Sequence, residues 1–192
     1  DGGKSVVDTV TEMVGTIGEN LSFRRSAGIT VSEGVVASYV HGAVAPNQGK
    51  IGVLIGLQSA GDAGKLAEFG KQLAMHIAAA NPQWVSQEEV DTDAVDRERE
   101  VLADQAREAG KPEEIVQKMV DGRLRKYYEE VCLMDQTFVI DGETKISKAV
   151  EAAAGDAGAP IKIVGFARFQ LGEGIEKEES DFAAEVAATA GG

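Results

Sequence analysis

The stretch VVASYVHGAVAPNQGKIGVLIGL, residues 35–57, decides the fold. Two runs rich in branched apolar residues flank a short loop that carries Pro46 and Asn47. Branched residues favour strands, and so short a connection joins antiparallel strands, because parallel strands need a long crossover. The sequence therefore predicts a β-hairpin, with His41 and Gly42 at the end of its first strand.

The flanking segments extend this hairpin into a larger sheet covered by helices. Residues 21–31, LSFRRSAGITV, precede it and predict a further strand of an antiparallel meander. Residues 5–17 predict a helix that ends at Gly18. Residues 63–80 repeat apolar side chains every three or four positions, which is one face of a helix. That face consists of Leu66, Phe69, Leu73, Ile77 and Ala80.

Residues 91–130 have a different character, because they are highly charged and rich in helix formers. Gly110 and Pro112 interrupt them, as expected where one helix ends and the next begins. Narrow apolar stripes consist of Val95, Leu102 and Ala109 before the break and Ile115, Val116, Met119 and Val120 after it. Such stripes predict two helices that pack on each other and project as a coiled-coil-like hairpin.

The last part of the chain predicts an extended segment at 137–141, a helix at 145–154 and a strand at 161–174. A small amphipathic helix at 180–190 follows. The fold class is therefore α+β, with an antiparallel β-sheet packed with helices, an inserted helical hairpin and a C-terminal helix. The predicted domains are a core of residues 1–90 and 131–172, the hairpin 91–130 and a C-terminal helical module 173–192.

Composition excludes several functions. The formal net charge of −13 repels phosphate backbones and anionic headgroups, so we expect no direct contact with nucleic acid or a membrane. The single cysteine, Cys132, cannot form a disulfide within the chain and favours a reducing compartment, the cytoplasm. No apolar run reaches the length of a membrane span, and no signal peptide is visible. Because the first residue is Asp1 rather than Met, we expect a fragment or a processed form.

The Gly49-Lys50 pair invites comparison with a P-loop, whose pattern is Gly, four residues, then Gly-Lys-Ser/Thr. Val44 stands where the first Gly belongs, and Ile51 stands where the metal-binding hydroxyl belongs. The flanks also predict strand-loop-strand instead of strand-loop-helix. We therefore reject a phosphate-binding loop and interpret this stretch as a hairpin loop.

The remaining reactive side chains suggest neither a catalytic group nor a metal site. His76 lies beside an apolar helical face and is predicted to be a partly buried structural histidine, whereas His41 is the better candidate for an external contact. Acidic neighbours are expected to raise the pKa of the Cys132 thiol and to blunt its nucleophilicity. Arg24 and Arg25 leave an anion patch open, although a structural ion pair is the commoner role. This pattern favours a binding protein over an enzyme and predicts no cofactor.

Several blocks together resemble the bacterial elongation factor Ts family, the nucleotide exchange factors of elongation factor Tu. They occur in the order and spacing of that family and cover most of the chain. The blocks are IGENLSFRR (17–25), YVHG (39–42), IGVL (51–54), AMHIAAANP (74–82), GKPEEIVQKMVDGRLRKYYEEVCLMDQTFV (110–139) and GFARFQLGEGIEKEESDFAAEV (165–186). The resemblance implies an α+β core subdomain, a protruding helical hairpin and a C-terminal helix. It also implies that an N-terminal helical module and a first core half lie outside these residues.

By this resemblance, the chain is not an enzyme but binds elongation factor Tu and promotes GDP release, so that GTP can bind. It would do so by deforming the partner's nucleotide and Mg²⁺ site, with no catalytic, cofactor or metal residue of its own. The residues expected at the partner are His41, Gly42, Asp181, Phe182 and Val186. Two assemblies stay open, a homodimer and a heterotetramer with the partner. The alternative function is a non-catalytic structural or assembly subunit that acts through the helical hairpin.

Overall fold

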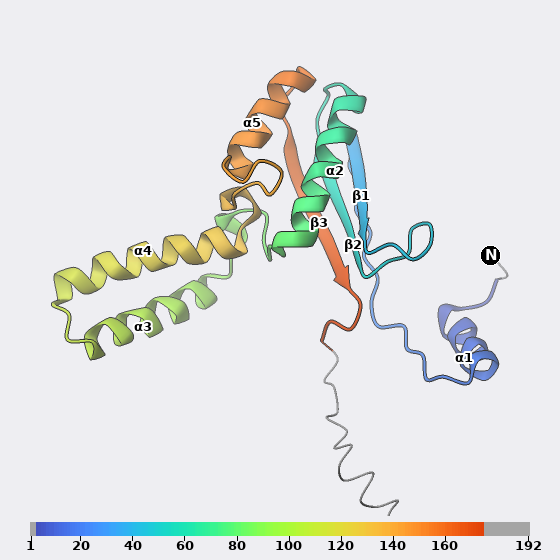
Figure 1. Cartoon of the computed structure of the whole chain (residues 1–192), viewed down its shortest axis with the longest axis horizontal. Helices are drawn as coiled ribbons and strands as arrows, with labels where there is room; N and C mark the ends of the chain where they lie inside the picture. The colour runs from blue at the N-terminus through green and yellow to red at the C-terminus, as the bar shows by residue number, and fades with distance from the viewer. Residues whose placement is uncertain (1–2, 175–192) are drawn as a thin grey trace, which may run out of the picture.

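The computed structural model describes residues 3–174, which form a three-stranded antiparallel sheet, helices on one of its faces and a projecting helical hairpin (Figure 1). The strand order is β1-β2-β3, so β2 lies in the middle. The α+β class is therefore confirmed. The helices and strands are α1 (Val6–Ile17), β1 (Gly34–His41), β2 (Ile51–Gln58), α2 (Ala63–Ala80), η1 (Gln87–Glu89), α3 (Thr92–Glu108), α4 (Glu113–Val131), η2 (Leu133–Asp135), α5 (Ile146–Ala157) and β3 (Lys162–Gln170).

The predicted hairpin of β1 and β2 is present. His41 pairs with Ile51 at its closed end, and the N–H of Lys50 donates to the carbonyl of His41 at 2.9 Å. Gly49 lies so close to β1 that a Cβ there would stand 2.7 Å from the carbonyl oxygen of His41. The loop therefore needs glycine for a close approach of two backbones.

The predicted strand at 21–31 is wrong. Among the described residues the sheet has three strands, and β3 takes the free edge of β2 in an antiparallel register from Ile51↔Gln170 to Gln58↔Lys162. Ile29 and Val31 instead cross the face of the sheet opposite the helices. A Cβ on Gly56 would stand 2.7 Å from Cγ2 of Ile29.

Two arginines tie residues 21–31 to the end of β3. The guanidinium of Arg25 forms an ion pair with Glu173 and lies 4.8 Å from the ring centroid of Phe169. Arg24 donates to the backbone carbonyls of Glu173 and Gly174. The structural ion pair favoured by the sequence is confirmed.

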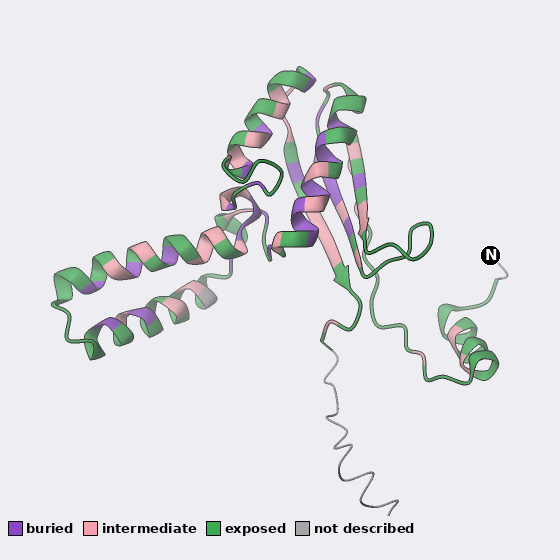
Figure 2. Cartoon of the chain, viewed as in Figure 1, coloured by how far each residue is buried: buried purple, intermediate pink, exposed green. Residues whose placement is uncertain are grey.

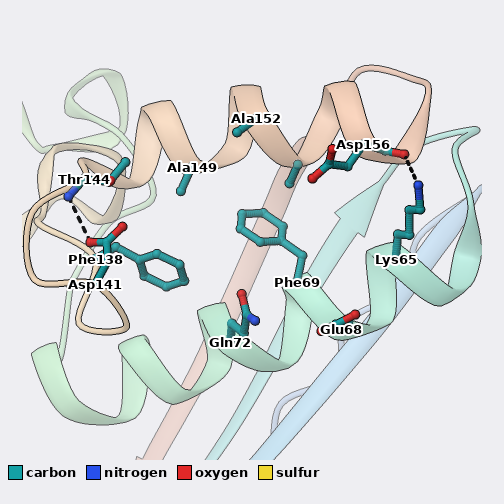
Figure 3. A pocket seen from close by; sticks show the side chains of 11 residues that line it. Lys65, Glu68, Phe69, Gln72, Phe138, Asp141, Thr144, Ala149, Ala152 and Asp156 are labelled. Atoms are coloured by element: carbon teal, nitrogen blue, oxygen red, sulfur yellow. Dashed lines mark hydrogen bonds between the residues drawn. The ribbon is translucent and has the colours of Figure 1, made fainter.

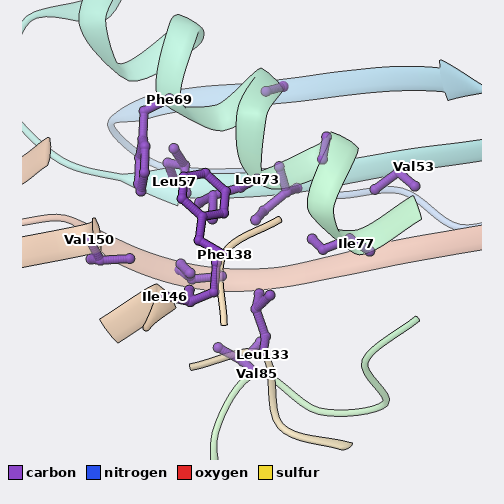
Figure 4. Packing of buried hydrophobic residues seen from close by; sticks show 14 of the residues in the cluster. Val53, Leu57, Phe69, Leu73, Ile77, Val85, Leu133, Phe138, Ile146 and Val150 are labelled. Carbon is purple, nitrogen blue, oxygen red and sulfur yellow. The ribbon is translucent and has the colours of Figure 1, made fainter. Parts of the chain in front are cut away.

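The core lies between the sheet and the helices α2 and α5 (Figures 2 and 4). Most of the predicted face of α2 is buried, with Leu73 and Ile77 fully inaccessible to solvent, whereas Ala80 is half-buried. This face packs on the inward face of the sheet and on residues that follow α4 and begin α5. The labelled members of this cluster are Val53, Leu57, Phe69, Leu73, Ile77, Val85, Leu133, Phe138, Ile146 and Val150.

The inserted segment forms the predicted helical hairpin of α3 and α4, which stands away from the sheet (Figure 1). It has a small apolar cluster of its own, made of Leu102, Ala106, Val116, Val120 and Leu124. The predicted apolar stripes are confirmed only in part, because Ala109 and Ile115 are exposed. Both lie next to the turn, where Gly110 has a φ of 70°.

The first helix, α1, agrees with its prediction, and Gly18 ends it with a φ of 77°. None of its residues is buried within the described part of the chain. The predicted C-terminal helix, with Asp181, Phe182 and Val186, lies outside the described residues.

A candidate protein-docking surface

A depression of about 530 Å³ lies where the end of β1 meets the end of α2 and the turn that follows η2. We call it the His41 hollow. It is lined by Tyr39, His41, Ile51, Met75, Ala78, Ala79, Val139, Ile140 and Arg168. The sheet, a helix and a turn thus contribute to one mainly apolar surface.

His41 is the last residue of β1 and is exposed, as the sequence predicts. The hydroxyl of Tyr39 lies 3.2 Å from its Nδ1, and the two rings are 6.2 Å apart. Gly42 follows with a φ of 60°, which turns the chain away from the sheet. The hydrogen bond orients the imidazole, so its other nitrogen is directed away from Tyr39. The contact of His41 with a partner stays a prediction.

The turn beside His41 replaces the extended segment expected at 137–141. The N–H of Phe138 donates to the carbonyl of Thr144 at 2.7 Å, and the N–H of Gly142 donates to the carbonyl of Phe138 at 2.8 Å. Oδ1 of Asp141 accepts from the N–H groups of Glu143 and Thr144, both at 2.9 Å (Figure 3). These bonds fold residues 138–144 into a compact turn.

This turn presents two apolar side chains that the sequence did not single out. Val139 and Ile140 are each 47% exposed and line the His41 hollow. Their branched side chains predict a strand, which is why the segment was expected to be extended. The available signal was the Asp141-Gly142 pair directly after them, because Asp-Gly favours turns.

Arg168 places a positive charge at the floor of the hollow. Its side chain is only 9% exposed, and its guanidinium donates to the carbonyl of Ala78 at 3.3 Å and to Oε1 of Gln170 at 2.8 Å. The first of these bonds satisfies a carbonyl near the end of α2, where helix carbonyls lack partners within the helix. Arg168 therefore holds β3 and α2 together beneath the exposed residues.

His76 lies behind the turn and is fully buried, so its predicted structural role is confirmed while its burial is more complete than expected. Its Nδ1 accepts from the N–H of Val139 at 3.2 Å, and its Nε2 lies 2.8 Å from Oε1 of Gln136. These partners assign the proton to Nε2 of a neutral ring. Burial lowers the pKa of His76, opposed by the hydrogen bond to Gln136.

A second depression, of about 540 Å³, lies between α2 and α5 (Figure 3). Phe69 and Phe138 line it, and Lys65 at its edge donates to the backbone carbonyl of Asp156 at 2.7 Å. Phe138 faces this depression, whereas the next residue, Val139, lines the His41 hollow. One turn therefore shapes both surfaces.

The metal-ligating and thiol groups of residues 3–174 are either dispersed or buried. Within residues 3–174, no three His, Cys, Asp or Glu side chains gather as a metal site would require. The thiol of Cys132 is buried, and burial, with smaller contributions from Asp135, Glu88 and Glu89, raises its pKa to about 11. The acidic neighbours alone predict the direction of this shift correctly, but burial is its largest cause. Over the same residues no helix is long and apolar enough to cross a membrane.

Comparison with known proteins identifies the family. A family model described as "Elongation factor TS" matches residues 1–173. The protein named elongation factor Ts of Rhodospirillum centenum is 61% identical over 189 residues, 98% of this chain and 62% of that protein. The proteins of the same name from Rhodospirillum rubrum and Mesorhizobium japonicum are 62% and 55% identical, over 97% and 96% of this chain and 60% of each relative. The chain thus spans about three-fifths of the length of these relatives. The chain belongs to the elongation factor Ts family.

Proposed function

We propose that this chain is the part of a guanine nucleotide exchange factor that binds elongation factor Tu and promotes the release of GDP, so that GTP can bind. The observation that carries the proposal is the His41 hollow, where Val139 and Ile140 stand half exposed beside His41. Apolar side chains held on a rigid turn and surrounded by polar groups are typical of protein contacts.

Exchange of this kind needs no catalytic side chain. A factor that binds the nucleotide-free partner more tightly than the GDP-bound partner must, by linkage, weaken GDP binding by the same factor. The contacts deform the partner's nucleotide and Mg²⁺ site, and the free energy comes from the protein interface. A surface of apolar residues, one histidine and one buried arginine suits that mechanism.

The proposal divides the work among the parts of the chain. The core, residues 1–90 and 131–172, carries the His41-Gly42 contact. The module 173–192 docks through Asp181, Phe182 and Val186 as a second contact. The tip of the hairpin, near Gly110, lies away from the exchange site. Both a homodimer and a heterotetramer with the partner are compatible with this proposal, and the mass of the purified complex distinguishes them.

The direct test measures the release of a fluorescent GDP analogue from elongation factor Tu after this chain is added. We expect faster release that rises with the concentration of the chain and is reduced by His41→Ala. If GDP release stays at the spontaneous rate at a saturating concentration of the chain, the proposal for these residues is refuted.

The second candidate is a structural or assembly subunit acting through the hairpin. The observation that favours it is the separate apolar cluster of α3 and α4, which lets the hairpin stand away from the sheet. Capture of elongation factor Tu with and without excess GDP separates the two functions. Only an exchange factor is displaced by GDP, because only an exchange factor competes with the nucleotide through linkage.

A further inference from the structure

The side chain of His76 bridges the core helix α2 and the turn that bears Val139 and Ile140. Its Nδ1 accepts from the backbone N–H of Val139 at 3.2 Å, one residue before Ile140. Its Nε2 donates to Oε1 of Gln136 at 2.8 Å. Nε2 of Gln136 donates in turn to the carbonyl of Glu130 at 2.7 Å. The ring therefore joins α2 to both the start and the middle of the segment that follows α4.

Packing alone does not require these bonds. The ring of Phe138 lies 5.9 Å from that of His76 in an edge-on arrangement, which any aromatic side chain could supply. An apolar side chain of similar size would fill the space, but it would leave the N–H of Val139 and the amide of Gln136 without these partners. An unpaired buried polar group is costly, so the turn would move to satisfy it.

The other hydrogen bonds of the turn do not involve the backbone N–H of Val139. They join Phe138 to Thr144, Gly142 to Phe138, and Asp141 to Glu143 and Thr144. These bonds close the turn upon itself, while the buried ring of Phe138 packs on Phe69 of α2. Among the hydrogen bonds of the described residues, the one from Val139 to His76 ties the backbone at the exposed residues to the side of the hollow formed by Met75 and Ala79.

We propose that His76 is a positioning residue of the docking surface: by accepting the N–H of Val139 from inside the core, it fixes the orientation in which Val139 and Ile140 are presented beside His41. The inference rests on the proposed function, because it assigns the turn to the contact with elongation factor Tu. His76 itself is buried and does not contact the partner, and it acts through the backbone of Val139.

Two substitutions separate this role from a general contribution to stability. In His76→Asn, the amide oxygen occupies the place of Nδ1 and can still accept from Val139, while the bond to Gln136 is lost. In His76→Gln, the amide nitrogen occupies the place of Nε2 and can still donate to Gln136, while the bond from Val139 is lost. Each variant loses one hydrogen bond of the buried ring, so the two are matched.

The first measurement is hydrogen exchange at the amide of Val139 in the isolated chain. Loss of one hydrogen bond should accelerate exchange by about tenfold in His76→Gln and leave it close to the original rate in His76→Asn. The second measurement is the affinity for nucleotide-free elongation factor Tu. We expect about tenfold weaker binding for His76→Gln and less than about threefold for His76→Asn, at similar thermal unfolding midpoints.

The outcomes distinguish the two proposals. Unchanged exchange at Val139 in His76→Gln overturns the positioning role whatever the partner does. Equal losses of affinity in both variants also overturn it, because they indicate stability alone. If the unsubstituted chain fails to bind elongation factor Tu while the exchange pattern is as expected, the proposed function fails and His76 still holds the turn.

Discussion

The hydroxyl of Tyr39 lies 3.2 Å from Nδ1 of His41, two positions further along the same face of β1. This contact sets the direction of an exposed imidazole that would otherwise rotate about its side-chain bonds. Removing the hydroxyl with Tyr39→Phe should therefore weaken binding to elongation factor Tu by about 0.5–1.5 kcal/mol, the usual net value of one hydrogen bond. Calorimetric titration measures the change. Tyr127→Phe on α4 is the matched control, and an equal loss there would argue against the contact.

Val139→Asp should reduce the affinity for elongation factor Tu by at least about tenfold, because it places a charge in an apolar contact that must lose water. The unfolding free energy should change little, because the Val139 side chain is 47% exposed. The matched control is Val101→Asp on α3, where the side chain is 50% exposed and distant from the His41 hollow. Surface plasmon resonance gives the affinities. Equal affinities for the two variants would contradict the assignment of the docking surface.

The stability of the chain should fall as the pH drops below about 6.5, the ordinary pKa of histidine. Burial lowers the pKa of His76 in the folded chain, so the unfolded chain binds more protons in this range. The free energy of unfolding must then rise with pH and be lost as the pH falls through the window between the two pKa values. Urea unfolding at pH 7.5 and 5.5 measures the slope. His76→Asn is the control, and a slope that persists in that variant would come from other groups.

The thiol of Cys132 should not react with a disulfide reagent in the folded chain at pH 8. Its pKa of about 11 leaves about one thiolate in a thousand, and its side chain is fully buried. The absorbance of the reagent's coloured thiol product should show no release from the folded chain. One equivalent of that product per chain should appear once urea unfolds the chain. Rapid reaction without urea would mean that the segment around Cys132 opens locally. The same burial argues that an interchain disulfide at this position would first require such opening.

Leu102→Ala should lower the stability of the helical hairpin by about 2–4 kcal/mol, because it removes a buried side chain from a cluster too small to close over the cavity. Affinity for elongation factor Tu should stay within about twofold of the original value, since no residue of this cluster lines the His41 hollow. Amide exchange along α3 and α4 reports the first effect and titration reports the second. A large loss of affinity would favour the assembly function of the hairpin.

Much of the fold could be predicted because its signals are local. The face of α2 repeats Leu66, Leu73 and Ile77 at helical spacing, and these side chains are buried as expected. Gly18 and Gly110 end helices with positive φ, a conformation that glycine adopts without strain. In each case a few neighbouring residues determine the structure.

The errors came from interactions between distant residues. The pattern of residues 21–31 is compatible with a strand, but β2 has only two edges, and β1 and β3 occupy both. Nothing within residues 21–31 reveals that competition. The same holds for His76, whose helical position predicts a buried ring but cannot reveal that its Nδ1 meets the N–H of Val139. Contacts that join separate elements therefore decide both the sheet and the surface beside it.

The order of strands in the sheet also bears on how the chain folds as it is made. β2 can pair with β1 once both strands of the hairpin have been synthesised, whereas its second edge is covered only after β3 has been made, because Ile51 pairs there with Gln170. The α3–α4 hairpin, whose contacts are local, can form during that interval. Until then, the open edge of β2 offers free backbone groups to any neighbouring strand. Residues 162–170, the last of the three described strands to be synthesised, should therefore protect the nascent chain from aggregation as well as complete its sheet.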